Sequence, residues 1–229
     1  MNIIRKYLKN FLAFFYTDKD ANVEEISKEK YKEIFIKDKS DDKIKETYDK
    51  AWEAKNFEIE NYWKRANYFW AFQVASFAGY FAVLSSEAYV KNPQILYSVI
   101  CIGFISSLAW VFINIGSKTW QRHWENHVDM LEDKVTGPLY KIITEKKTYS
   151  VSKINEIISR FFATIWVILG IEYFIEHVSF KWNGIENIDI VVVLSTLAVI
   201  YFSGAMYWGY GRGRFGKRNV VFYKRKVNE

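Results

Sequence analysis

The chain has 229 residues and a net charge of +6, with 19% aromatic and 25% charged residues. Because apolar and charged residues fall in separate segments, the composition excludes an ordinary soluble domain and indicates a membrane protein with a charged part outside the bilayer. The single cysteine, Cys101, excludes an intrachain disulfide framework and a zinc site built from several cysteines.

The first part of the chain is rich in charged and helix-forming residues. Apolar side chains from Ile4 onward follow helical spacing, which fits a helix lying on the membrane surface as well as one packed against the protein's own soluble part. No small-residue cleavage site follows, so we do not expect a signal peptide. Residues 27–35 and 41–63 predict two exposed amphipathic helices, the second capped by Asp41 or Asp42 and continuous with the apolar segment behind it.

Four segments are long and apolar enough to cross a membrane, each close to the ~20 residues that span a hydrocarbon core. Short polar loops join the first segment to the second and the third to the fourth, which predicts two antiparallel hairpins. The sequence therefore predicts an all-α membrane protein with four transmembrane helices and a cytoplasmic helical part. The predicted spans are Ala66–Leu84, Ile95–Ile115, Phe161–Phe180 and Ile188–Tyr207.

The basic residues indicate the orientation of these spans. Of the 32 Lys and Arg residues, only Lys91 lies in the first hairpin loop and only Lys181 in the second. Cytoplasmic loops carry the excess of Lys and Arg, so both termini are expected in the cytoplasm of a bacterial inner-membrane protein. This distribution accounts for most of the basic charge, and binding to nucleic acid is not needed to explain it.

The predicted organisation divides the chain into five parts. A cytoplasmic helical region, 1–62, includes the N-terminal amphipathic helix and precedes the first transmembrane hairpin, 63–115. A cytoplasmic helical loop, 116–158, leads to the second hairpin, 159–210, and the chain ends in a basic cytoplasmic tail, 211–229. Glycines among the basic residues of this tail do not form a nucleotide-binding loop, and the tail is expected to contact anionic lipid.

The stretch "WQRHWENHVDMLED" follows the second predicted span and predicts a cytoplasmic continuation of that helix. Two histidines four residues apart could share a metal, but the glutamate between them does not stand where a zincin motif needs it, and no third ligand is evident. We therefore expect no metal and a structural role, in which the tryptophans pack this helix against the helix before the first span. The motif residues are Trp120, His123, Trp124, Glu125 and His127.

Four polar residues fall inside predicted spans and are candidates for a function within the membrane. Glu172 and Glu176 share one face of the third span, where they could attract cations or carry a proton, or sit at the headgroups if the helix begins earlier. Gln73 and Asn114 lie on faces with small residues, which favours contacts between helices over the lining of a pore. No catalytic constellation and no cofactor motif is visible.

Two Trp-rich stretches, Tyr62–Leu84 and Ser117–Lys141, resemble together a poorly characterised family of small bacterial integral membrane proteins. The resemblance implies an inner-membrane location and a structural role for the Trp/His/Glu helix. Two classes of non-enzymatic function stay open. One is a channel-like oligomer or membrane effector in the lipid bilayer, and the other is an interaction module that recruits a cytosolic protein partner.

Overall fold

The structure is a computed structural model, and the regular secondary structure of its described residues is helical apart from a two-residue antiparallel ladder between β1 (Phe180–Lys181) and β2 (Gly184–Ile185). The predicted N-terminal surface helix and the basic tail beyond residue 211 lie outside the described residues. Two compact units are present, a larger one of residues 26–203 and a smaller one that contains the chain ends. The described residues are 24–143, 145, 148–177, 180–181, 184–185 and 189–211.

Helix α3 (Asp41–Leu84) joins the charged N-terminal region to the first predicted span without a break, as the sequence predicts. At ~1.5 Å per residue it is about 66 Å long, twice the thickness of a hydrocarbon core. The expected aspartate cap is wrong, because the Ser40 hydroxyl accepts the hydrogen bond from the Lys43 N–H. Asp41 and Asp42 instead occupy the first turn, where negative charge favours the helix N-terminus.

Helix α5 (Gln94–Leu131) likewise continues from an apolar half into the Trp/His motif, which confirms the predicted continuation. No charged residue occurs between Gln94 and Ser117, whereas the remaining turns carry charges of both signs. A helix of this length, about 57 Å, therefore extends well beyond the ~30 Å of a hydrocarbon core. The 3-10 turn η1 (Glu132–Lys134) ends it.

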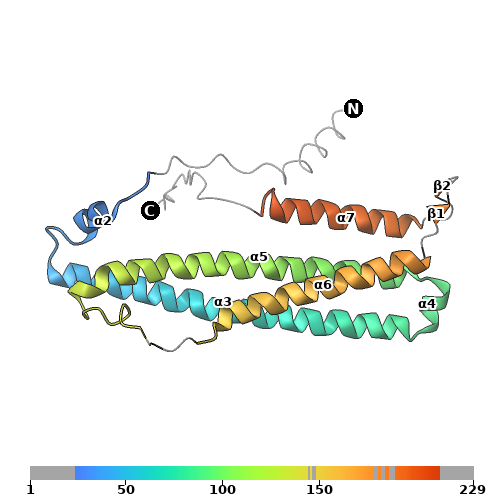
Figure 1. Ribbon diagram of the computed structural model, residues 1–229, viewed down its shortest axis with the longest axis horizontal. Coiled ribbons are helices and arrows are strands. Elements are labelled where there is room, and N and C mark those ends of the chain that lie inside the picture. The colour runs from blue at the N-terminus through green and yellow to red at the C-terminus, as the bar shows by residue number, and fades with distance from the viewer. Residues whose placement is uncertain are drawn as a thin grey trace, which may run out of the picture. The chain divides into compact units, whose positions relative to one another are not determined.

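Helices α3, α5 and α6 (Val151–His177) lie side by side along much of their length (Figure 1). The short helix α4 (Glu87–Lys91) turns the chain between α3 and α5. One apolar cluster, which includes Tyr80 and Trp166, lies toward the α4 end, and a second, which includes Tyr48 and Leu131, packs the charged halves of α3 and α5.

Helix α2 (Lys28–Phe35) and helix α7 (Ile190–Tyr207) join this three-helix core from opposite ends of the chain. Tyr31 and Phe35 of α2 pack on the second cluster. Val192 belongs to the first cluster, and Thr196 lies 2.8 Å from the Tyr97 hydroxyl. In the smaller unit, the end of α7 closes with a hydrogen bond from the Gly211 N–H to the Ala205 carbonyl.

By length and hydropathy, three described helices could cross a membrane: α5 with its terminal turn, α6 and α7. The predicted first span, in α3, is not among them, because Tyr and Trp rings and the polar Asn67 and Gln73 lower its hydropathy. Trp110, in the predicted second span, is fully buried, and its ring centroid lies 6.1 Å from that of Phe69 and 6.0 Å from that of Phe162.

Candidate functional site

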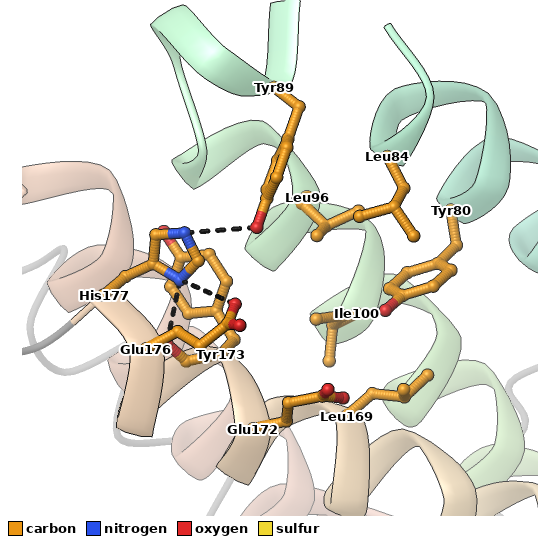
Figure 2. Close-up of a pocket in the computed structure, with 10 residues that line it drawn as sticks. All are labelled: Tyr80, Leu84, Tyr89, Leu96, Ile100, Leu169, Glu172, Tyr173, Glu176 and His177. Carbon is orange, nitrogen blue, oxygen red and sulfur yellow. Dashed lines mark hydrogen bonds and ion pairs between the residues drawn. The ribbon is translucent and has the colours of Figure 1, made fainter.

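A small pocket lies where α3 ends, α5 begins and α6 ends, and we call it the tyrosine–carboxylate pocket (Figure 2). Its volume is about 170 Å³. The carboxylates of Glu172 and Glu176, one helical turn apart, line it together with Tyr80, Tyr89 and Tyr173. Among the described residues, neither lysine nor arginine lines it, so this lining carries negative charge.

His177 closes one side of this pocket and uses both ring nitrogens. The Tyr89 hydroxyl lies 3.3 Å from Nε2, and the Tyr173 carbonyl oxygen lies 3.2 Å from Nδ1. A neutral imidazole with its proton on Nδ1 satisfies both contacts, donating to the carbonyl and accepting from the hydroxyl. The same Nδ1 lies 3.8 Å from Glu176 Oε2, a longer contact than the other two.

Two polar groups of the pocket have no hydrogen-bond or ion-pair partner in the described part of the chain. Tyr80 is 9% exposed, and its hydroxyl points toward the pocket without a hydrogen-bond partner among the described residues (Figure 2). The Glu172 carboxylate, on an exposed position of α6, makes no ion pair or hydrogen bond there either. The geometry thus leaves acceptor atoms directed into a negatively charged space.

Gln73, the first of the two predicted polar residues in the spans, is buried between three helices. Its Nε2 donates to Ser106 Oγ at 2.9 Å, and its Oε1 accepts from the Trp166 indole N–H at 2.8 Å. Trp166 fits there because Gly103 has no side chain, since a Cβ at that position would lie 2.2 Å from the indole ring. Gln73 therefore joins helices within one subunit.

Asn114 has the same kind of role nearer the charged halves of the helices. Its Oδ1 accepts from Asn155 Nδ2 at 3.1 Å, and its Nδ2 donates to Ser159 Oγ at 3.3 Å. Asn155 also donates to the Tyr62 hydroxyl at 2.8 Å. These bonds connect α3, α5 and α6 and leave Asn114 only 4% exposed, so it does not line an open space in the subunit.

The rings of the predicted Trp/His motif form a continuous series along one side of α5. His123 contacts Trp120, Trp124 and His127, with ring centroids 5.6, 5.0 and 4.8 Å apart. His127 also contacts α2, since its Nδ1 lies within hydrogen-bonding distance of the Tyr31 hydroxyl, at 2.7 Å. Glu125 accepts a hydrogen bond from Gln121 at 2.9 Å. No group of three His, Cys, Asp or Glu residues placed to hold a metal occurs in the described part of the chain.

A buried lysine beside this motif was missed by the sequence analysis. Lys55 is 7% exposed, and its Nζ lies 3.2 Å from the Trp52 ring centroid and 4.6 Å from that of Tyr140. Burial lowers the pKa of Lys55, and the negative charges of Glu125 and Asp129 act against that shift. The spacing of Lys55 from Tyr48 and Trp52, seven and three residues, is a signal that could have placed it on the buried face of α3.

A family model matches residues 45–175, more than half of the chain, and it describes the octameric membrane protein family (8xMP). The chain belongs to this family. No match was found among curated proteins or among solved structures.

The 8xMP match covers most of α3, all of α5 and α6 as far as Ile175. Both Trp-rich stretches noted in the sequence fall inside the matched residues. The matched part also contains Gln73 and Asn114 and their bonding partners, so the three-helix core described above is the region shared with the family. Within the tyrosine–carboxylate pocket, Glu172 lies inside the match and Glu176 just beyond it, whereas all of α7 is outside.

Proposed function

We propose that this protein is a non-enzymatic, channel-like homo-oligomer of the bacterial inner membrane. Its subunits would turn the Glu172 face of α6 toward a water-filled space that attracts cations. The observation that carries the proposal is an exposed carboxylate without an ion pair among the described residues, on a helix that is suited to span the membrane. The family description, an octameric membrane protein, supports an assembly of eight copies.

The position of Glu172 along α6 argues that it lies below the membrane surface. Arg160 and Glu172 are twelve residues apart, which is about 18 Å along a helix axis and less than the ~30 Å of a hydrocarbon core. Arg160 can extend its long side chain to the cytoplasmic surface, where it pairs with Glu156. Glu172 lines a pocket with Tyr80, one turn before the end of α3, so we place it just inside the opposite surface.

A carboxylate below the membrane surface is unfavourable where it faces lipid, and assembly of several subunits can remove that cost. A charge exposed to lipid costs up to ~2.5–3.5 kcal/mol on insertion scales, with the largest values at the bilayer centre, so intramembrane carboxylates face protein or water. Among the described residues, Glu172 is exposed and forms no ion pair. A neighbouring subunit or a water-filled space between subunits would therefore supply what the single chain lacks.

The proposal includes four spans, with α3 as the first. Its charge-free stretch from Ala66 to Leu84 is about 28 Å long, and it packs along the apolar half of α5 as the other arm of a hairpin. Reporters inserted near Lys91 and Asn183 should read external, and reporters near Lys146 and after Glu229 should read cytoplasmic. A cytoplasmic signal at Asn183 would contradict the four-span topology.

Ion flux in proteoliposomes tests the channel directly. At equal reconstituted amounts, the wild type should pass monovalent cations, and Glu172→Gln should reduce that flux severalfold because a negative group on the path is lost. Glu87→Gln is the matched control, since Glu87 is an exposed carboxylate of the α4 loop that does not line the pocket. Native mass spectrometry of the detergent-extracted protein should give eight copies. A wild-type protein that passes no cation would refute the channel.

A second candidate function, recruitment of a cytosolic protein, is favoured by one observation. A groove of about 620 Å³ lies between α2 and the far end of α5, lined by side chains that include Lys32 and Met130. A photo-crosslinking residue placed at Met130 should capture a discrete partner in cells, whereas one at Phe57, exposed elsewhere on α3, should not. Equal labelling at both positions would argue against recruitment through this groove.

A further inference from the structure

We propose that the tyrosine–carboxylate pocket binds an alkylammonium group, the cationic head that a free primary amine or an aminophospholipid presents. This inference concerns the same carboxylates as the proposed function and rests on it only for the level of the pocket in the membrane. It specifies the chemistry of the cation that occupies the pocket.

The charge of the pocket calls for a cation. Glu172 and Glu176 are one helical turn apart on α6, a spacing at which like charges repel. His177 lies beside them, but its two nitrogens are already engaged by Tyr89 and by the Tyr173 carbonyl. Among the described residues, neither lysine nor arginine lines the pocket, and the basic side chain nearest the carboxylates is that of His177, whose Nδ1 lies 3.8 Å from Glu176.

The acceptors of the pocket match an ammonium group better than a metal ion. A primary ammonium has three N–H donors, and the pocket offers three acceptors, the carboxylates of Glu172 and Glu176 and the Tyr80 hydroxyl. Of these, Glu172 and the Tyr80 hydroxyl have no hydrogen-bond partner among the described residues, and Glu176 lies 3.8 Å from His177 Nδ1. Tyrosine rings beside the carboxylates add favourable cation–π contact. Metal binding would call for a further ligand, and the described residues hold no group of three His, Cys, Asp or Glu suited to an ion.

The size and the apolar side of the pocket point to a short alkyl chain on the nitrogen. Its volume of about 170 Å³ is well below the ~300–1,000 Å³ of pockets for drug-sized ligands. Leu84, Leu96 and Ile100 form the side opposite the carboxylates and can receive the carbon atoms (Figure 2). The pocket lies at the ends of the helices, so a lipid headgroup and a soluble amine could both reach it.

Binding by the full-length protein in detergent tests the inference. Calorimetry with ethanolamine hydrochloride against sodium chloride at equal ionic strength measures the free amine. Native mass spectrometry with phosphatidylethanolamine against phosphatidylglycerol of the same acyl chains measures the lipid. We expect saturable binding of ethanolamine, of phosphatidylethanolamine or of both, and whichever binds identifies the source of the ammonium group.

The variants assign that binding to the pocket. Glu172→Gln should weaken it about tenfold, because a charge-assisted hydrogen bond is lost, and Tyr80→Phe should weaken it less. Glu87→Gln should leave it unchanged, and equal thermal midpoints will show that the variants are folded. The inference is overturned if neither compound binds, if sodium displaces ethanolamine at equal concentration, or if Glu172→Gln binds as tightly as the wild type. Ammonium binding without cation flux would refute the proposed channel alone, and flux without ammonium binding would refute this inference alone.

Discussion

Replacing Gly103 by alanine should destabilise the three-helix core. The loss should be larger than for alanine at any other described glycine of α3, α5 or α6. The new Cβ would lie 2.2 Å from Cε2 of Trp166 and 2.5 Å from two further ring atoms. Trp166 is fully buried and stacks on Phe77 at 4.3 Å between centroids, so its ring has little room to retreat. Overpacking of this kind costs about 1–3 kcal/mol.

Part of the cost comes from the hydrogen bond that a displaced ring would lose. The Trp166 N–H donates to Gln73 at 2.8 Å, and interhelical hydrogen bonds in membranes contribute about 0.6 kcal/mol on average. The total expected loss for Gly103→Ala is therefore about 2–4 kcal/mol. Gly79→Ala is the matched control, because the nearest atom to its new Cβ would be 3.8 Å away, an ordinary contact.

Thermal or denaturant unfolding in detergent, followed by circular dichroism, measures the difference between the two variants. Gly79→Ala should be neutral or slightly stabilising, since alanine favours a helix over glycine. Combining Gly103→Ala with Trp166→Phe should recover part of the loss, because the smaller ring leaves space for the methyl group. If Gly103→Ala unfolds at the same point as Gly79→Ala, the close approach of α5 to the Trp166 ring is wrong.

The remaining predictions concern the part of the molecule formed by α2 and the charged halves of α3 and α5. Burial raises the pKa of Tyr31 to about 12, so the stability it contributes is present below pH ~10 and lost as the pH rises toward 12. Hydrogen exchange should show α2 opening in that range, and Tyr31→Phe should remove part of the pH dependence, while an unchanged profile would contradict the assignment. Lys55→Met should lower the free energy of unfolding by about 1 kcal/mol through the lost cation–π contact, whereas Lys50→Met, at an exposed position, should not. His123→Ala and His127→Ala should alter thermal stability but not metal content by mass spectrometry, and stoichiometric zinc that either variant loses would contradict this.

The sequence was sufficient for the continuity of α3 and of α5. The predicted third span was placed too late, because α6 begins at Val151 and ends at His177, before the strand residue Phe180. Hydrophobic periodicity and the absence of glycine and proline between residues 41 and 78 predicted a long helix, because these properties are local. The N-cap of α3 was assigned to the wrong residue, because Ser40, Asp41 and Asp42 can all accept a hydrogen bond. Only the backbone geometry distinguishes Ser40 as the cap.

Contacts between helices could not be predicted, because they depend on how each helix is rotated about its axis. The fit of Trp166 against Gly103 joins residues 63 positions apart, and neither residue alone indicates the other. Tryptophan is most common at membrane surfaces, so a Trp in the middle of a predicted span was a signal for a buried partner such as Gln73. The same argument applies to Lys55. Its spacing from Tyr48 and Trp52 indicates the buried face of α3, but nothing in the sequence indicates that Tyr140 contacts it.

The polar residues of the membrane half separate into two groups by whether their bonds are satisfied inside one subunit. Gln73 and Asn114 are enclosed and fully engaged with neighbouring helices, and each can therefore be explained as part of the fold. Glu172 and the Tyr80 hydroxyl have no such bonds in the described part of the chain, although leaving a charge without a partner in a membrane is costly. Folding of a single chain gives no reason to keep these two groups where they are. A second subunit, water or a cation that completes the pocket would explain their placement.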